Sequence, residues 1–464
     1  MDELLNSSLV TIAGSIANGR VTSKEVVTAF LDRIERVNSE LNAVVYSTAE
    51  PALKYADKAD ADLKNGHSHG ALHGVPVTIK DSLDTIDAIT TWGTLGRKEF
   101  TPGRDATCVE RLRNQGAILM GKTNTPEFTL SFQTDNLVYG KTNNPFDPGL
   151  TPGGSSGGAA SIIAAGASPL DIGTDTGGSI RLPSHFSGIA GIKPTTGRVP
   201  CTGNALPSTG LISPLSQPGP MARYVEDLSF ILKIISGPDL LDPHAVDAPW
   251  HDPEQVNVTR LRIGYHTDNG ISTPATEIVQ TIKNVLDLLK DHNLVAHEAR
   301  PGGLEMAGFI MARVFSADSG EMLNVLLEDC RTQTPSPTIL RHMKRPPSEL
   351  SATEFAQVLN LWQNYQSSML GYFNDFDILI SPVNAHTAIK HGEKEDMDAY
   401  TYTSAYNLTG WPATVIRAGT SETGLPIGIQ ILSRPFREDH CLALAAWLQS
   451  KLGTFPPPGI NVFG

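Results

Sequence analysis

Apolar residues near the start of the chain recur with the period of an α-helix. In the stretch KEVVTAFLDRIERVN they occupy positions 26, 27, 30, 31 and 34, which places them on one face of a helix. Ser23 stands immediately before this stretch and is a suitable N-cap residue. A second amphipathic stretch, PALKYADKADADLKNG, ends at Gly66. Residues 1–65 are therefore predicted to form helices.

Short apolar runs alternate with a helical pattern in the next part of the chain. Residues 74–80 (GVPVTIK) and 117–121 (AILMG) have the length and composition of buried strands. Residues 105–115, which lie between them, show helical spacing. Such alternation is typical of βα units around a mostly parallel or mixed sheet, so the pattern predicts an α/β fold.

The same patterns continue to the end of the sequence. Further strands are predicted over residues 261–265, 376–382 and 424–432, and helical structure over 219–237, 276–292, 306–372 and 438–452. Residues 238–258 are rich in Pro and Asp and predict a loop. No internal repeat or clear boundary interrupts the chain, so we expect one domain over residues 1–464.

Composition and charge narrow the class of protein. The chain has 464 residues, of which 40% are hydrophobic and 18% charged, as in a globular protein with a large core. The net charge is −13 without a cationic cluster, which argues against nucleic-acid binding. With no signal peptide and no long apolar run, we expect no membrane segment and a cytoplasmic location. The four widely spaced cysteines predict reduced, buried thiols.

Residues 153–198 form an unusually glycine-rich segment. It contains eleven of the 42 glycines, together with several serines and threonines, and few charges. A surface linker can be equally rich in glycine, but the apolar run at 162–165 argues against one. The segment therefore predicts tight turns around buried chemistry.

Ser179, in DTGGSIR, is the best candidate for that chemistry. Glycines directly before a serine let backbone N–H groups converge beside its hydroxyl, as an oxyanion hole requires. Nucleotide binding is a weaker interpretation, because GGSSGG lacks the GK[ST] ending of a P-loop and the spacing of a dinucleotide fingerprint. In isolation, a GGS turn in which the serine caps a helix would be the simpler interpretation.

A serine nucleophile also needs a base, and the sequence offers two candidates. His185 lies in the same segment, but no GxSxG elbow accompanies it. Lys80 ends the apolar run GVPVTIK, where desolvation would lower the pKa of its amine and allow it to act as a base. A lysine at the end of a strand is otherwise most often a solvent-facing charge.

Taken together, these segments resemble the amidase signature family. The matching segments are GVPVTIKD (74–81), GKTNTPEF (121–128), TNNPFD (142–147), TPGGSSGGAA (151–160), DIGTDTGGSIRLPS (171–184), GIAGIKPTTGRV (188–199), GPMAR (219–223) and GLPIGIQIL (424–432). The resemblance covers essentially the whole chain and is strongest over residues 70–225. It implies a large mixed central β-sheet covered by helices on both faces, with residues 240–370 as a variable, mainly helical region that shapes the substrate site.

The resemblance also implies a serine, cis-serine, lysine triad. By position in the motifs, Ser179 is the nucleophile, Ser155 the bridging serine after a cis peptide bond, and Lys80 the base. The expected oxyanion hole consists of the backbone N–H groups of Thr176, Gly177, Gly178 and Ser179. The expected supporting network consists of Ser156, Asp175 and Arg181, although an ordinary buried ion pair between the last two is compatible with the same residues.

Substrate-binding residues follow less directly from the resemblance. Residues 128–131 correspond to the wall of the family's acyl pocket, which singles out Leu130 and the carbonyl of Thr129. Trp92 stands where the family often has a small residue, so it either lines the entrance or is a surface tryptophan. Asn407 matches a family segment near the pocket.

The implied activity is hydrolysis of the C–N bond of a small carboxylic amide through an acyl-enzyme. The alternatives are a carbamate or aryl-acylamide hydrolase with esterase side activity, or the A subunit of a tRNA-dependent amidotransferase. The stretch RHMKRPPSELSATEFAQVLNLWQNYQSS lacks segments characteristic of that subunit, and the complete triad argues against a catalytically inactive binding module. We expect no cofactor and no metal, because His386 and His391 lack metal-ligand spacing; a homodimer is left open.

Overall fold

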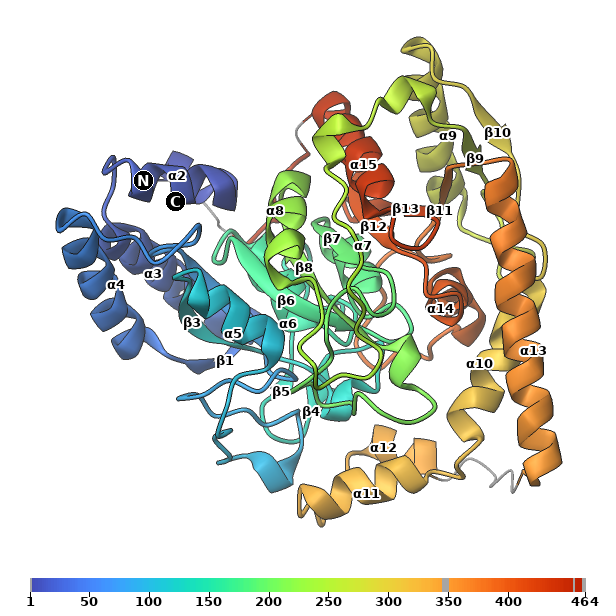
Figure 1. Cartoon of the computed structure of the whole chain (residues 1–464), viewed down its shortest axis with the longest axis horizontal. Helices are drawn as coiled ribbons and strands as arrows, with labels where there is room; N and C mark the ends of the chain where they lie inside the picture. The colour runs from blue at the N-terminus through green and yellow to red at the C-terminus, as the bar shows by residue number, and fades with distance from the viewer. Residues whose placement is uncertain (1, 344–349, 454, 461–464) are drawn as a thin grey trace.

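An eight-stranded mixed sheet forms the centre of the computed structural model, which describes residues 2–343, 350–453 and 455–460 (Figure 1). Its strands are hydrogen-bonded in the order β10-β9-β11-β13-β12-β7-β8-β6. Strand β9 is parallel to β10 and β11, and the other pairs are antiparallel. The strands are β6 (Leu170–Asp175), β7 (Ala190–Lys193), β8 (Gln217–Ala222), β9 (Ile263–Tyr265), β10 (Ala296–Glu298), β11 (Ile378–Pro382), β12 (Ala413–Thr420) and β13 (Pro426–Ser433).

A three-stranded sheet in the order β1-β3-β2 lies beside β6. Strand β1 (Val44–Ser47) is antiparallel to β3 (Ile118–Thr123), and β2 (Pro76–Lys80) is parallel to β3. All five residues of β2 are buried. This position brings the end of β2, and with it Lys80, next to the glycine-rich segment around β6.

Helices pack on the large sheet in two groups. Helices α8 (Val225–Ile235) and α15 (Glu438–Leu452) pack together and against β7, β8, β12 and β13. Helices α6 (Gly157–Ala164) and α7 (Arg181–Ser187) form a second pair, which contacts β6, β12 and β13. The expected α/β architecture with a large mixed sheet and flanking helices is therefore confirmed.

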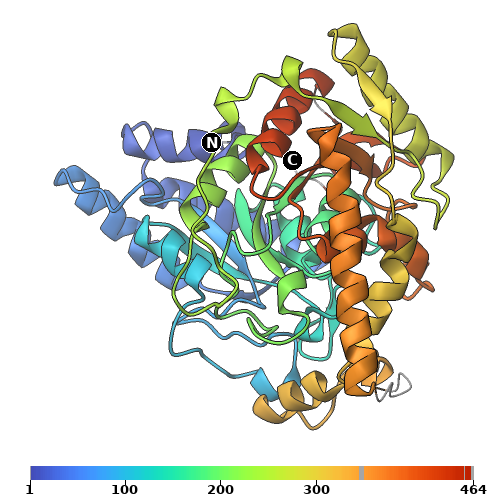
Figure 2. The same ribbon diagram turned by 45° about the vertical axis from the view of Figure 1, so that its right-hand side comes forward.

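The remaining helices extend the fold at its two ends (Figure 1). At the N-terminal end lie α1 (Asp2–Leu5), α2 (Leu9–Ala17), α3 (Ser23–Leu41), α4 (Ala49–Lys64) and α5 (Thr107–Asn114). Turning the molecule shows α13 as a long helix along the opposite side (Figure 2). That side contains α9 (Thr276–Asp291), α10 (Ala307–Ser316), α11 (Glu321–Asp329), α12 (Pro337–Met343), α13 (Ala352–Leu370) and α14 (Thr401–Leu408). Residues 306–372 are mainly helical as predicted, and residues 344–349 lie outside the described part of the chain.

Two large hydrophobic clusters fill this architecture. One joins the N-terminal helices, α6, α8, α9 and α15 to the sheets. The other packs α10, α11, α13 and α14 around Trp362, Trp411 and Phe128. Because Phe128 belongs to a segment that matches the signature, the second cluster connects the variable helices directly to the candidate site.

Three expectations about local structure are wrong. Residues 219–222, predicted as the start of a helix, lie in β8, because they pair with both β6 and β7. The helix begins only at Val225. The predicted helical region 1–65 contains β1, which pairs with β3. The N-cap of α3 is Thr22, whose hydroxyl accepts the backbone N–H of Glu25, whereas Ser23 donates its hydroxyl proton to the Gly74 carbonyl.

None of the described helices is both long enough and apolar enough to cross a membrane. All four cysteines are buried free thiols, as predicted.

The capping of α3 gives a direct test of this local structure. Because Thr22 and Glu25 form a complete capping box, Thr22→Ala should lower the free energy of unfolding by about 1 kcal/mol. Thr22→Ser keeps the hydroxyl and should retain most of the stability. Urea denaturation followed by circular dichroism measures both. Equal stability of wild type and Thr22→Ala would contradict the assigned cap.

Candidate active site

Three hydroxyl groups surround the amine of Lys80. Its Nζ lies 2.7 Å from Ser155 Oγ, 2.9 Å from Ser156 Oγ and 2.9 Å from Thr174 Oγ1. Ser155 and Ser156 directly precede α6, and Thr174 lies near the end of β6. The end of one strand, the end of a second strand and the start of a helix therefore meet at this amine.

Lys80 is fully buried, and its nearest hydrogen-bond partners are neutral. Burial lowers the pKa of Lys80 well below the ordinary value of 10.5, and the negative charges of Asp171 and Asp175 oppose that change. Desolvation disfavours the charged amine more than these charges favour it. The environment thus favours a neutral amine, which can accept a proton.

Ser179 lies in the turn between β6 and α7, and 5% of its surface is exposed. Gly178, which precedes it, has φ +134°, and a Cβ there would collide with the Thr403 side chain. Glycine is therefore required at this position. The backbone N–H of Ser156 donates to the carbonyl of Ser179 over 3.2 Å. This hydrogen bond joins the turn to the segment before α6 that contains Ser155 and Ser156. The Gly154–Ser155 peptide bond is cis, as the resemblance predicts.

The four N–H groups expected to form an oxyanion hole differ in their partners. The N–H of Gly178 donates to Asp175 Oδ1 over 2.8 Å, so this donor is engaged within the protein. In the hydrogen bonds of the described residues, the N–H groups of Thr176, Gly177 and Ser179 do not occur as donors. Three of the expected donors therefore remain open to a ligand, and Gly178 is the exception.

A buried ion pair between Asp175 and Arg181 supports the turn that contains Ser179. Arg181 donates from Nε and Nη2 to the two carboxylate oxygens of Asp175, both over 3.0 Å, and neither side chain is exposed to solvent. Burial alone would raise the pKa of Asp175, but the guanidinium of Arg181 holds it below its ordinary value. The carboxylate also accepts the backbone N–H of Ile180. It therefore fixes the backbone on both sides of Ser179.

Asn407 takes part in the hydrogen bonds of this ion pair. Its Oδ1 accepts Arg181 Nη2 over 2.6 Å, and its Nδ2 donates to Asp175 Oδ1 over 2.8 Å and to the Leu215 carbonyl. Both polar ends of the side chain are therefore engaged within the protein and the residue is buried; its expected contact with the substrate stays a prediction.

His185, the other candidate base, is directed elsewhere. Its Nδ1 accepts the backbone N–H of Gly428, and its Nε2 lies 3.0 Å from the His386 carbonyl. Burial lowers the pKa of His185 to about 4. Both ring nitrogens are thus occupied by backbone groups, and of the two candidate bases Lys80 is the one that lies beside the serines.

Trp92 is held within the protein framework. Its indole N–H donates to Asp84, and the Arg97 guanidinium lies 3.4 Å above its ring. Its backbone bonds to Asp81, which follows Lys80, and to Phe128. This half-buried side chain is neither a free surface tryptophan nor a lining residue of the two cavities described below.

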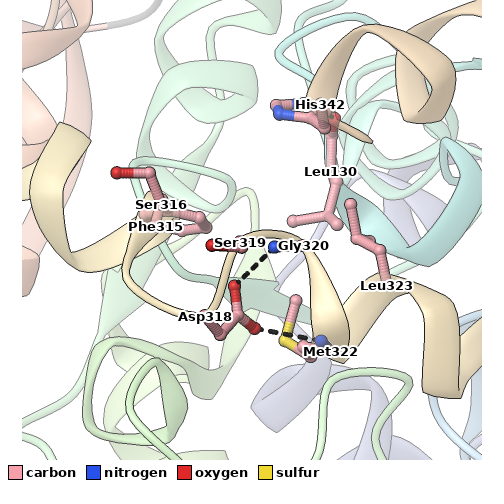
Figure 3. A pocket seen from close by; sticks show the side chains of 9 residues that line it. All are labelled: Leu130, Phe315, Ser316, Asp318, Ser319, Gly320, Met322, Leu323 and His342. Atoms are coloured by element: carbon pink, nitrogen blue, oxygen red, sulfur yellow. Dashed lines mark hydrogen bonds between the residues drawn. The ribbon is translucent and has the colours of Figure 1, made fainter. Parts of the chain in front are cut away.

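Leu130 lines a small cavity of about 30 Å³ beneath the turn between α10 and α11, together with Phe315, Leu323 and His342 (Figure 3). Asp318 holds that turn by accepting the N–H groups of Gly320 and Met322. Thr129 is buried with φ +63°. Ser179 lines neither this cavity nor a larger one of about 710 Å³ beside Phe186 and Tyr400. The variable helices therefore contact the expected acyl wall at Leu130.

Two residues that touch the site, Thr174 and Thr403, are not among the predicted ones. Thr174 supplies the third hydroxyl around Lys80, and Thr403 donates its hydroxyl proton to the Gly177 carbonyl over 2.7 Å. Thr174 was within reach of sequence reasoning, since it lies in the matching segment DIGTDTGGSIR. Thr403 could not be found in this way, because 226 residues separate it from its partner Gly177.

Comparisons with known proteins show the family to which the chain belongs. The chain matches the family model described as Amidase over residues 25–442. It is 32% identical to an indoleacetamide hydrolase of Bradyrhizobium diazoefficiens, with 96% of this chain and 86% of the relative covered. It is 34% identical to the glutamyl-tRNA(Gln) amidotransferase A subunit of Chloroflexus aurantiacus, with 94% of this chain and 95% of the relative covered.

Solved structures give the same assignment. A 6-aminohexanoate cyclic dimer hydrolase superposes with a TM-score of 0.89 at 25% identity, covering 98% of this chain and 99% of the other. A bacterial aryl acylamidase superposes with a TM-score of 0.86 at 25% identity, covering 96% of both chains. The chain therefore belongs to the amidase signature family, a family of amide-hydrolysing enzymes.

Proposed function

We propose that this protein hydrolyses the C–N bond of small carboxylic amides through an acyl-enzyme on Ser179, with Ser155 and Lys80 as the proton relay. The observation that carries the proposal is the buried Lys80 Nζ at 2.7 Å from Ser155 Oγ. A neutral amine has two N–H groups and one lone pair. The three neighbouring hydroxyls match this set if Ser156 and Thr174 each accept an N–H of the amine and the Ser155 hydroxyl donates its proton to the lone pair.

The first half of the reaction forms the acyl-enzyme. Lys80 accepts the proton of Ser155, which takes the proton of Ser179 as the Ser179 oxygen attacks the carbonyl carbon. The negative charge on the former carbonyl oxygen is stabilised by the N–H groups of Thr176, Gly177 and Ser179. The C–N bond then breaks while the proton returns from Lys80 through Ser155 to the leaving nitrogen.

The second half releases the acid. After the amine departs, Lys80 is neutral again and Ser155 carries its own proton. Water attacks the ester carbon of acylated Ser179 and loses a proton through the same relay. Collapse of the second tetrahedral intermediate returns that proton to the Ser179 oxygen. The free carboxylic acid leaves, and every proton that the relay accepted has been returned.

The relatives support a small amide as substrate. Their names specify an indoleacetamide, an aryl acylamide and a 6-aminohexanoate cyclic dimer. Carbamates and aryl acylamides are alternative substrates for the same relay, and esters would be cleaved as a side activity.

Substitution of the nucleophile and the base tests the proposal. Ser179→Ala and Lys80→Ala should each reduce kcat/KM for a chromogenic anilide by at least about 10³-fold, because attack and proton transfer are both lost. Ser187→Ala is a matched control: Ser187 is buried on α7, and its Oγ has no hydrogen-bond partner in the described part of the chain. Wild-type activity in Ser179→Ala would exclude the mechanism.

The relay also predicts a difference between leaving groups. An amine must be protonated as it leaves, whereas a nitrophenolate leaves without a proton. In Lys80→Ala the rate on a p-nitroanilide should therefore fall at least about tenfold more than the rate on the p-nitrophenyl ester with the same acyl group. Equal losses on both substrates would show that Lys80 does not deliver a proton to the leaving group.

A second candidate function is that of an amidotransferase A subunit, since several relatives at 31–34% identity have that name. The two functions differ in what the isolated chain does. We expect the purified protein alone to release ammonia from simple amides at a rate that added tRNA and ATP do not change. Activity that appears only with partner subunits and charged tRNA would favour the second candidate.

A further inference from the structure

Asp171 is a buried carboxyl group that the proposed mechanism does not use. It lies in β6 and has no solvent exposure. Its Oδ2 accepts the hydroxyl proton of Thr78 over 2.7 Å and that of Thr123 over 3.0 Å. Thr78 and Lys80 are two residues apart in β2 and point to the same face of that strand. Thr123 lies opposite Lys80 in the register of β2 and β3.

The carboxyl group therefore contacts β2, which carries Lys80, and β3, which pairs with β2. Burial raises the pKa of Asp171 to about 7, while hydrogen bonds from Thr78, Thr123 and the backbone of Lys80 lower it. Lys122 of β3 also lowers it through its charge. A second carboxylate that acts on Lys80, Asp175, is neutralised by its ion pair with Arg181. Among the described residues, no arginine forms such an ion pair with Asp171.

We propose that Asp171 is a positioning residue for Lys80, which fixes β2 and β3 around the amine and whose charge sets the fraction of Lys80 that is neutral. The inference rests on the proposed function, in which neutral Lys80 is the base. An ionised Asp171 stabilises the protonated amine, whereas a protonated Asp171 does not. The two groups therefore titrate as a coupled pair.

Removal of the charge of Asp171 should move the pH profile in a defined direction. In Asp171→Asn, the amide oxygen can still accept the Thr78 and Thr123 hydroxyls, but the negative charge near Lys80 is lost. The pKa of Lys80 should fall, so the acid limb of the kcat/KM–pH profile should move to lower pH by about one unit. A structural role alone would lower activity or stability without moving this limb.

Two further variants keep the test decisive. Thr123→Val preserves the carboxyl group but removes one hydrogen bond to its ionised form, so Asp171 is protonated more often. The acid limb should move in the same direction by a smaller amount. Asp227→Asn is the matched control, because Asp227 is also buried with its pKa raised to about 7, but it accepts the backbone N–H groups of Leu9 and Val10. The acid limb of the kcat/KM–pH profile of Asp227→Asn should match that of wild type.

The outcomes separate this inference from the proposed function. If neither Asp171→Asn nor Thr123→Val moves the acid limb relative to Asp227→Asn, the role of Asp171 is wrong. If Lys80→Ala retains wild-type activity, the proposed function is wrong and the inference falls with it. Loss of activity in Lys80→Ala combined with unmoved limbs in the other variants would overturn the inference alone.

Discussion

The burial of the Lys80 amine among hydroxyl groups is the constraint on which the site depends. A charged ammonium group is costly to bury without a bonded carboxylate, so its surroundings favour the neutral form. Ser155 and Ser156, directly before α6, and Thr174 in β6 provide those surroundings. In the proposed mechanism, this desolvation is what allows Lys80 to act as a base.

A buried ion pair holds the turn that contains Ser179. Asp175 and Arg181 form an ion pair without solvent exposure, and Asn407 bonds to both. Because the carboxylate also accepts backbone N–H groups on either side of Ser179, a shift of the turn would break buried hydrogen bonds to a charged group. The N–H of Gly178 contributes to this support, so the proposed oxyanion hole consists of the N–H groups of Thr176, Gly177 and Ser179.

The sequence predicted the parts of this protein that depend on local pattern. The helices at 23–41 and 438–452 and the strand at 76–80 follow from hydrophobic spacing, and the signature motifs singled out Lys80, Ser155 and Ser179. Strand β8 escaped prediction because its sequence, QPGPMA, has little strand propensity and is held by pairing with β6 and β7. The place of Asn407 beside Asp175 depends on a contact across 232 residues, which no local pattern records.

Covalent labelling is the most direct test of the central claim, that Ser179 is a nucleophile activated through Lys80. The protein would be incubated with a serine-directed fluorophosphonate, and the adduct located by peptide mass spectrometry. The account predicts one adduct, on Ser179, and loss of labelling in Lys80→Ala. An adduct on Ser155, or labelling of Lys80→Ala at the wild-type rate, would contradict it.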